Sequence, residues 1–478
     1  MSVAFPSAAA LQPFTEPPSL SASEVGDLED WDRSCLWKPF TQMAGYVEGK
    51  PLVIEEGRGN WLRDVHGRAF LDGVSSLWVN VHGHCHPTIT AAVREQLRTL
   101  DHATLLGPTN VAATRLARAL VDVAPGDGAL SRVFYSDSGS TSVEIALKMA
   151  YQFHAQSRVA SERCRDVFVA LSNAYHGDTL GSVSVGGIDL FHEVYGPLLF
   201  EVRRAPAPDP YHLDFGGDVA AHEEQCLVRL REVFEGCEGR LAALIVEPLV
   251  QGAAGMIRHT ERYLQQAAQL CRDFGGLLIV DEVATGFGRS GHLFASEQAG
   301  VVPDLMCLAK GITGGVLPLA ATLATEHIYQ GFLGRYDEYR TFFHGHSYTG
   351  NPLACAAALG SLRVFEEEQV LSRLQPRLQQ LSVHMERVSE LPHVGDVRRL
   401  GVMTGIELVR DRDTGEPFEL ALQIGHQVAE AAMEHGVLIR PLGNVVVLMP
   451  PLSITEAELD LLCGAVHAAI EQVCDQQG

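Results

Sequence analysis

The chain has 478 residues, of which 46% are hydrophobic and 20% charged, and its formal net charge is −23. This composition is typical of a globular enzyme with two or three domains, and the negative charge argues against nucleic acid or an anionic membrane as a partner. No apolar run approaches the ~20 residues of a membrane span, and the ten scattered cysteines lack a C-x-x-C pair, which argues against a disulfide framework or a zinc site.

The first 81 residues contain a proline-rich stretch and then a series of short apolar runs. Residues 1–30 lack periodicity, so we expect residues 1–33 to form a mobile arm. The chain start also lacks a basic-then-apolar leader pattern, and free thiols favour a reducing compartment, so the expected location is the cytoplasm. Apolar runs separated by Gly, Asn and Asp turns predict short strands over residues 52–81.

Three histidines and a cysteine alternate in residues 82–86, which resembles a metal-binding pattern. Metal ligands usually converge from more than one segment, however. Pro87 begins a predicted helix that extends to residue 100. We therefore predict no metal site.

Residues 132–144 have the pattern of a strand, a turn of small residues and a helix. The helices are predicted over residues 111–123 and 140–156. Free N–H groups at the start of a helix bind phosphate, which makes Gly139 and Ser140 candidates. An ordinary Ser/Thr helix cap explains the same pattern equally well.

Two further apolar runs, over residues 167–171 and 241–246, predict buried strands. After the first strand come Tyr175, which could cover one face of a flat ring, and His176, which is either a partner of that ring or a packed loop residue. The second strand ends in Glu247. Residues 201–240 between them are acidic, irregular and then helical, and we expect a surface excursion there.

Two neighbouring apolar runs, residues 277–280 and 305–309, end in Asp281 and Lys310. Both predict parallel strands buried on two faces, and α/β sheets place ligands at the ends of such strands. Pyridoxal phosphate (PLP) needs a lysine that holds it as a Schiff base and a carboxylate that keeps its pyridine nitrogen protonated. A structural ion pair is the commoner explanation of an isolated Lys–Asp pair.

The sequence after Asp281 also contains G-x-G-x-x-G over residues 286–291, the fingerprint of dinucleotide-binding oxidoreductases. Residues 283–285 separate the motif from the strand, and no clear helix begins at its third glycine. An oxidoreductase is therefore a weaker hypothesis.

The alternation of strands and helices stops after residue 350. Long helices are predicted over residues 352–368 and 371–391, followed by short strands (402–407 and 445–448) and helices (420–435 and 455–474), which indicates a separate α+β domain. Arg440, held between Pro and Gly turns, could bind a carboxylate bidentately, although an isolated arginine is more often a surface residue.

The segments IVDEVATGFGR and AKGITGG, with the spacing from Asp281 to Lys310, resemble the class III (fold type I) PLP-dependent aminotransferases. The resemblance covers residues 34–475. It implies an α/β fold with a mostly parallel, seven-stranded-type sheet between helices and a smaller α+β domain built from both chain ends. The implied divisions are an N-terminal small-domain part at 34–81, a PLP-binding large domain at 82–350 and a C-terminal small domain at 351–478.

The resemblance also implies roles for individual residues. Lys310 is the Schiff-base lysine, Asp281 the pyridinium partner and Tyr175 the stacking residue, and these three are the expected catalytic residues. The remaining cofactor-binding residues are Gly139, Ser140, His176, Glu247 and, from the other subunit of a homodimer, Ser347. The substrate-binding residues are Phe40, Trp78, Tyr175, Lys310, Gly345, Arg289 and Arg440, with the segment 37–43 over the pocket.

Motifs such as SSLWVNVHGH, FFHGHSYTGN and RPLG with MPPL are similar to the branch of this family that transaminates 8-amino-7-oxononanoate in biotin synthesis. Many members have Tyr where this chain has Phe40, and two tryptophans where it has Leu77 and Trp78. In that family both positions face the substrate, so the sequence does not decide between two amino donors, S-adenosylmethionine and lysine. The alternatives are another class III aminotransferase for an ω-amino acid such as 4-aminobutyrate, and a cofactor-binding regulator without catalysis, which the intact Lys310 and Asp281 disfavour.

Overall fold

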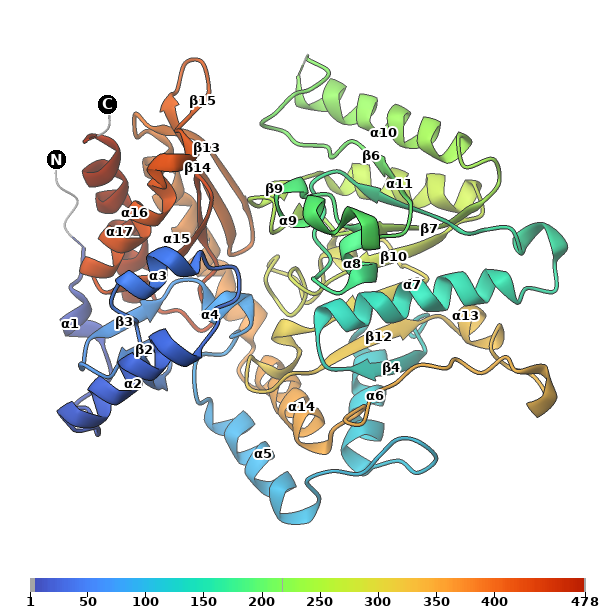
Figure 1. Cartoon of the computed structure of the whole chain (residues 1–478), viewed down its shortest axis with the longest axis horizontal. Helices are drawn as coiled ribbons and strands as arrows, with labels where there is room; N and C mark the ends of the chain where they lie inside the picture. Colours follow the sequence, from blue (N-terminus) through green and yellow to red (C-terminus); the bar gives the residue numbers. More distant parts are fainter. Residues whose placement is uncertain (1–4, 217, 477–478) are drawn as a thin grey trace.

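The computed structural model describes residues 5–216 and 218–476, and its larger part is built on a seven-stranded sheet (Figure 1). The sheet order is β4 (Arg132–Ser136), β12 (Ala320–Ala324), β11 (Leu305–Leu308), β10 (Leu277–Asp281), β7 (Leu241–Val246), β5 (Val167–Leu171) and β6 (Val202–Ala205). Only β12 runs antiparallel to its neighbours. The carboxyl ends of the other six strands therefore meet at one edge.

Helices cover both faces of this sheet, which explains why its central strands are unbroken apolar runs. Every residue of β7, β10 and β11 is buried. Ala243 and Ile245 pack with α7 (Gly139–Ala155) on one face, whereas Leu244 and Val246 pack with α10 (Val219–Glu235) and α11 (Glu261–Asp273) on the other. This alternation along β7 is the period of two that a strand requires.

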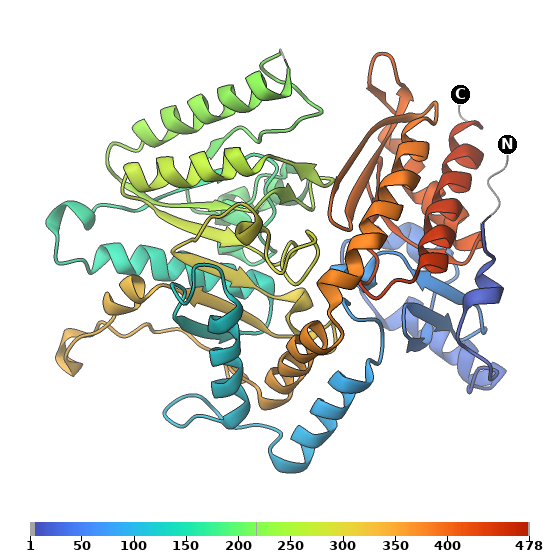
Figure 2. The same ribbon diagram turned by 180° about the vertical axis from the view of Figure 1, so that it is seen from behind.

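The smaller part combines both ends of the chain (Figure 2). One sheet pairs β1 (Ile54–Arg58), β2 (Trp61–Asp64) and β3 (Ala69–Asp72) with β16 (Val437–Leu438). A second sheet contains β13 (Val394–Leu400), β14 (Met403–Asp411), β18 (Val445–Leu448) and β17 (Arg440–Leu442), with β15 (Glu416–Pro417) at the side of β14. Residues of α15 (Val370–Ser389), α16 (Ile424–Glu434) and α17 (Glu456–Cys474) complete its core.

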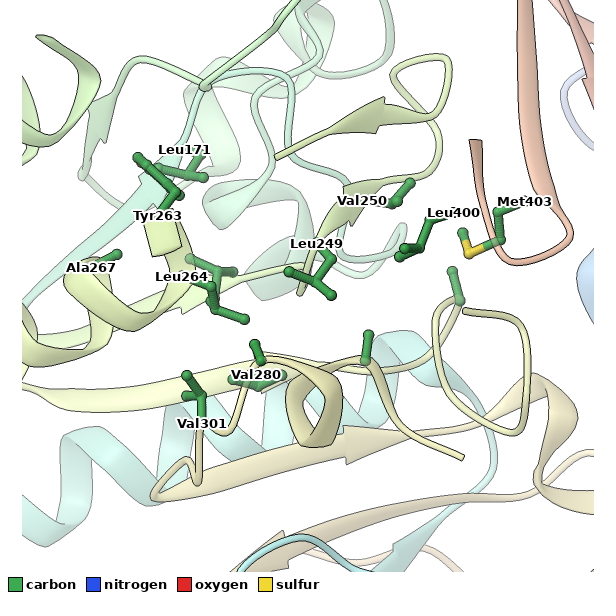
Figure 3. Packing of buried hydrophobic residues seen from close by; sticks show 14 of the residues in the cluster. Leu171, Leu249, Val250, Tyr263, Leu264, Ala267, Val280, Val301, Leu400 and Met403 are labelled. Atoms are coloured by element: carbon green, nitrogen blue, oxygen red, sulfur yellow. The ribbon is translucent and has the colours of Figure 1, made fainter. Parts of the chain in front are cut away.

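One apolar cluster joins the two parts. Leu400 and Met403, at the turn between β13 and β14, belong to the same cluster as Leu249 and Val280 of the larger part. Figure 3 shows Leu400 and Met403 directed toward Leu249 and Val250. Burial of this surface holds the small sheets next to the edge where the parallel strands end.

Several helices connect or flank these sheets. They are α2 (Ala22–Cys35), α3 (Met43–Glu48), α5 (Pro87–Thr99), α6 (Val111–Val123) and α14 (Pro352–Glu367). The predicted fold class, a mostly parallel α/β sheet between helices with a smaller α+β part, is confirmed. The domain boundaries at residues 33, 81 and 350 stay predictions. Among the described residues, no helix has both the length and the apolar character that crossing a bilayer requires.

Residues 1–33 were expected to form a mobile arm, and that stays a prediction. Of these, residues 5–33 are described, and α2 begins at Ala22 after a capping box in which Ser21 and Glu24 bond each other's backbone N–H. One expectation was wrong. Residues 201–240 were expected to be a surface excursion, but β6 forms the edge of the main sheet, parallel to β5. Strands β12 and β13 were not predicted at all.

Candidate active site

A cavity of about 630 Å³ lies at the edge where the parallel strands end. The segments that follow β4, β5, β7, β10 and β11 all contribute to its wall, as does the turn at Trp78. The cavity is therefore positioned by the sheet topology, as in other open α/β sheets. Eight of the predicted site residues line it: Trp78, Gly139, Ser140, Tyr175, His176, Glu247, Asp281 and Lys310.

Asp281 is the last residue of β10, and His176 holds its carboxylate. His176 Nδ1 donates to Asp281 Oδ2 at 2.7 Å, and the Val283 amide donates to Oδ1 at 3.0 Å. Both side chains are almost fully buried. The two hydrogen bonds fix the orientation of the Asp281 carboxylate and use one of the two imidazole nitrogens. His176 Nε2 has no hydrogen-bond partner in the described part of the chain.

Lys310 follows β11, the strand next to β10, so its side chain enters the same cavity. Its φ of 47° is left-handed, which is uncommon for a residue with a side chain. The Nζ atom lies 4.9 Å from the centre of the Trp78 ring. Burial lowers the pKa of Lys310, although the charges of Asp281 and Glu247 act in the opposite direction.

The first turn of α7 forms one end of the cavity. Ser138 caps this helix by accepting from the Thr141 amide, which leaves the amides of the first turn directed outward. A Cβ atom at Gly139 would lie 2.6 Å from a Val283 methyl carbon, so only glycine fits there. Ser140 Oγ accepts from the Thr179 amide at 2.9 Å, which joins this turn to the loop after β5.

Tyr175 and Glu247 are held together on the side of β5 and β7. The Tyr175 amide donates to Glu247 Oε1 at 3.1 Å, and the Gly252 amide donates to Oε2 at 2.8 Å. Burial raises the pKa of Glu247 to about 7. The Tyr175 hydroxyl donates to Asp178 at 2.8 Å, and burial raises the pKa of Tyr175. Glu247 thus fixes the backbone that carries Tyr175.

Five predicted residues do not line the cavity. Phe40 is exposed; its ring centre lies 5.6 Å from that of Phe191, and the Phe191 ring centre lies 6.4 Å from that of Tyr175. Gly345, Ser347 and Arg440 are exposed as well.

Arg289, the fifth, is 1% exposed. Its guanidinium donates to the carbonyls of Pro450 at 2.8 Å and Asn80 at 3.1 Å. Burial lowers the pKa of Arg289 to about 9. Among the described residues no carboxylate lies within ion-pair distance of Arg289, although the charge of Asp72 acts to raise its pKa. Arg289 is thus a buried guanidinium whose two hydrogen-bond partners are neutral carbonyls.

Sequence reasoning missed several residues of the cavity wall. Asp178, Thr179, Val283 and the segment 313–319 contribute to it. Asp178 and Thr179 stand in the motif YHGDT, whose position after β5 was a usable signal. No sequence motif marks Val283, because its contact with Gly139 depends on the tertiary packing of the turn after β10 against the start of α7.

The G-x-G-x-x-G motif at residues 286–291 and the histidine-rich segment 82–86 have other structural roles. Residues 286–291 form turns, and the next helix, α12 (Ala295–Gln298), has four residues and cannot serve as a dinucleotide-binding helix. His82 bonds Ser361, His84 bonds Asp72, and His86 bonds Glu368. The three imidazoles thus have separate partners.

The arrangement fits PLP. At one end of the cavity, α7 offers amides for a phosphate. At the sheet edge a buried carboxylate, Asp281, is held by His176, and the Lys310 amine points into the cavity and has no hydrogen-bond partner among the described residues. A phosphate, a ring nitrogen and an aldehyde are the three groups that these features would bind.

Comparisons with known proteins agree with this chemistry. The family model Aminotransferase class-III matches residues 44–470. An adenosylmethionine-8-amino-7-oxononanoate aminotransferase from Nitratidesulfovibrio vulgaris is 53% identical, over 96% of this chain and 84% of its own. The crystal structure of the adenosylmethionine-8-amino-7-oxononanoate aminotransferase from Methanocaldococcus jannaschii matches with a TM-score of 0.88 and 43% identity, over 94% of this chain and 99% of its own. A PLP-bound amine transaminase from an uncultivated Pseudomonas species matches with a TM-score of 0.86 and 36% identity, over 92% and 99%.

Proposed function

The chain belongs to the class III aminotransferases, which are PLP-dependent, and on that premise we propose that it transfers an amino group to 8-amino-7-oxononanoate, giving 7,8-diaminononanoate for biotin synthesis. S-adenosylmethionine is the proposed amino donor, with lysine as the other possibility. The observation that supports an aminotransferase most directly is the meeting of Lys310 and the Asp281–His176 pair in one cavity.

In this proposal three groups of residues would hold the cofactor. The amides of Gly139 and Ser140 would bind the phosphate, Asp281 would pair with the ring nitrogen, and Lys310 would supply the amine for the Schiff base. Tyr175 would cover the ring, while His176 orients Asp281 and Glu247 fixes the Tyr175 backbone.

When bound, PLP supplies an electron-withdrawing ring that allows the amino-bearing carbon of the substrate to lose a proton. Lys310 Nζ accepts this proton and later returns it. Because burial lowers the pKa of Lys310, a larger fraction of the amine is unprotonated near neutral pH than in water. The Asp281 carboxylate supplies the fixed negative charge that balances the protonated ring nitrogen.

The substrate carboxylate is assigned to Arg440, with Arg289 behind it. Arg440 lies in β17 directly after Ile439, whose side chain is beside Gly73 at the start of the Trp78 turn. Arg289 does not line the cavity and its guanidinium donates to the Pro450 and Asn80 carbonyls, so in this proposal it acts on the substrate carboxylate only through its buried positive charge. Phe40, Trp78 and Gly345 complete the proposed substrate pocket.

We also propose a homodimer located in the cytoplasm. All ten cysteines are free thiols, which is consistent with a reducing compartment. Ser347 is exposed and absent from the cavity of its own chain. A second subunit that contributes Ser347 to this cavity would explain both observations.

A donor panel tests the reaction. Purified enzyme loaded with PLP is given 8-amino-7-oxononanoate and one donor, and 7,8-diaminononanoate is quantified by mass spectrometry. We expect product with S-adenosylmethionine. Product with lysine alone would change the donor, and turnover of 4-aminobutyrate without any diaminononanoate would instead favour an ω-amino acid aminotransferase.

The Lys310→Ala variant tests the site assignment. Removing a proton-transfer group that is also the attachment point should lower kcat by at least about 10³-fold. Retained turnover in this variant would contradict the role of Lys310.

A further inference from the structure

Four consecutive residues, Ser75–Trp78, have left-handed backbone conformations although none is glycine. Their φ angles are 50°, 46°, 70° and 70°. In this region Cβ approaches the backbone carbonyl, so residues with side chains avoid it. Such a conformation persists only where neighbouring groups fix it.

Two side-chain anchors hold this turn: the Ser75 hydroxyl donates to the Met449 carbonyl at 2.7 Å, and Asp72, the last residue of β3, binds Ser76. The Asp72 side chain is fully buried. Oδ1 accepts from the Ser76 amide at 2.9 Å, and Oδ2 accepts from the Ser76 hydroxyl at 2.8 Å. The carboxylate therefore binds both polar donors of a residue in the middle of the turn.

The Asp72 carboxylate is itself oriented by His84. His84 Nε2 donates to Asp72 Oδ2 at 2.9 Å, while the Asn80 amide group donates to His84 Nδ1 at 2.9 Å. With Nδ1 accepting, the proton of the imidazole lies on Nε2 and faces Asp72. Asp72 is thus held from two directions.

The turn delivers Trp78 to the reacting amine. The Trp78 ring centre is 4.9 Å from Lys310 Nζ, and its edge packs on Gly252, where a Cβ would lie 3.2 Å away. Trp78 is the only residue of the turn in the cavity wall, as far as the described residues show. Because the backbone at Trp78 is itself left-handed, a relaxed turn would redirect the indole.

We propose that Asp72 is a positioning residue for the aminotransfer reaction, and that its carboxylate, oriented by His84, holds the turn Ser75–Trp78 so that the Trp78 ring stays against the Lys310 amine. The inference rests on the proposed function in taking Lys310 as the reacting amine. Asp72 itself does not line the cavity, so it acts through Trp78.

Asp64 provides a matched control. It ends β2 in the same sheet and is equally buried, and it too fixes a turn, by accepting from the amides of His66 at 3.0 Å and Arg68 at 2.8 Å. Its side-chain hydrogen bonds within the described part of the chain go to His66 and Arg68 and not to the Ser75–Trp78 turn. Asp64→Asn therefore shows how much stability and activity are lost when a buried carboxylate that holds another turn in this sheet is weakened.

The test is a double-mutant cycle on the full-length enzyme with Asp72→Asn, Trp78→Phe and both together. We expect Asp72→Asn to lower kcat/KM by about 10- to 100-fold, because small misplacements at a reacting centre cost that much. In the Trp78→Phe background the same substitution should cost less than about threefold, since its effect passes through Trp78. Asp64→Asn should lower the melting temperature and leave kcat/KM near that of the wild type.

Intrinsic fluorescence of the protein without cofactor gives a second readout. The difference between wild type and Trp78→Phe is the emission of Trp78. Asp72→Asn should change the emission spectrum in the wild-type background and leave it unchanged in the Trp78→Phe background. If Asp72→Asn does not accumulate as folded protein, Ser76→Ala, which removes only the hydroxyl that donates to Oδ2, takes its place in both cycles.

Equal losses of kcat/KM in both backgrounds, or an unchanged Trp78 emission, would overturn the proposal and leave Asp72 a purely structural residue. Absence of transaminase activity in the wild type would count against the proposed function, whereas the fluorescence cycle would still decide the role of Asp72.

Discussion

At the scale of single residues, the cavity joins groups whose protonation depends on one another. Glu247 is buried beside Asp281, and its two carboxylate oxygens accept only backbone amides. Burial raises the pKa of Glu247 from the ordinary 4.5 to about 7. The negative charge of Asp281 acts in the same direction, and His176 opposes it. Above pH 7, where Glu247 is charged in the fold, this shift lowers the free energy of unfolding by about 3 kcal/mol.

The pH dependence of stability follows from this shift. In the unfolded chain Glu247 loses its proton near pH 4.5, whereas in the fold it keeps the proton to about pH 7. Folding therefore takes up a proton between these values, so the contribution of Glu247 to the free energy of unfolding falls as pH rises through this window and is constant above it. The cofactor-free wild type should lose melting temperature from pH 5 to 7.5 more steeply than Glu247→Gln. Equal slopes would mean that Glu247 titrates normally.

Residues that depend on tertiary contacts were the hardest to predict. Asp281, Lys310 and Glu247 could be placed because they end apolar runs whose strands are parallel neighbours. Asp72 and His84 were not selected, because a left-handed turn without glycine leaves no mark in the sequence. The contacts of Arg289 were not predicted either, because its partners are carbonyls that residues 80 and 450 supply, and its role near the substrate stays a prediction.

At the scale of elements, the start of α7 is fitted against the turn after β10. The Cβ of an alanine at Gly139 would lie 2.6 Å from a Val283 methyl carbon, so either the helix start or the turn must move. Gly139→Ala should therefore weaken PLP binding by about 10-fold or more, because the shift would displace the amides of this turn, which we propose bind the phosphate.

Val283→Ala supplies the compensating change, because it removes the methyl groups that an alanine at 139 would contact. We expect the Gly139→Ala/Val283→Ala double variant to recover most of the PLP affinity lost in Gly139→Ala, measured by titrating cofactor-free enzyme. Failure of the second substitution to restore binding would show that the glycine is needed for another reason.

Element boundaries were predictable where burial makes the sequence simple. Strands β5, β7 and β18 were placed to the residue, because strands buried on both faces consist of apolar runs. Strand β6 was missed because it contains Arg203 and Arg204 at a sheet edge. Strand β13 was missed because it buries Arg398, whose charge is offset by Asp396 and Glu407 and whose Nε donates to the Gly255 carbonyl. The start of α2 could have been predicted, because Ser21 followed three residues later by Glu24 is the spacing of a capping box.

At the scale of the whole molecule, the segments 106–111 and 336–348 expose several aromatic and aliphatic side chains, namely Leu106, Val111, Tyr336, Tyr339, Phe343 and Tyr348. Other segments expose such side chains as well, among them Leu190 and Val194. Ser347 lies in the second of the two segments. Because exposed apolar side chains are often covered in an oligomer, we propose that residues 336–348 take part in the contact of the proposed dimer.

A mixed dimer tests whether Ser347 serves the neighbouring cavity. Lys310→Ala removes the reacting amine, and Ser347→Asp places a negative charge against the phosphate, so each variant alone should be nearly inactive. In a dimer with one chain of each kind, the chain with an intact Lys310 receives Ser347 from its partner, and that one site is complete. Co-refolding equal amounts should then restore about one quarter of wild-type activity, because half of randomly formed twofold dimers are mixed and each has one working site. If Ser347 instead served the cavity of its own chain, no site in the mixture would be complete and activity would not return.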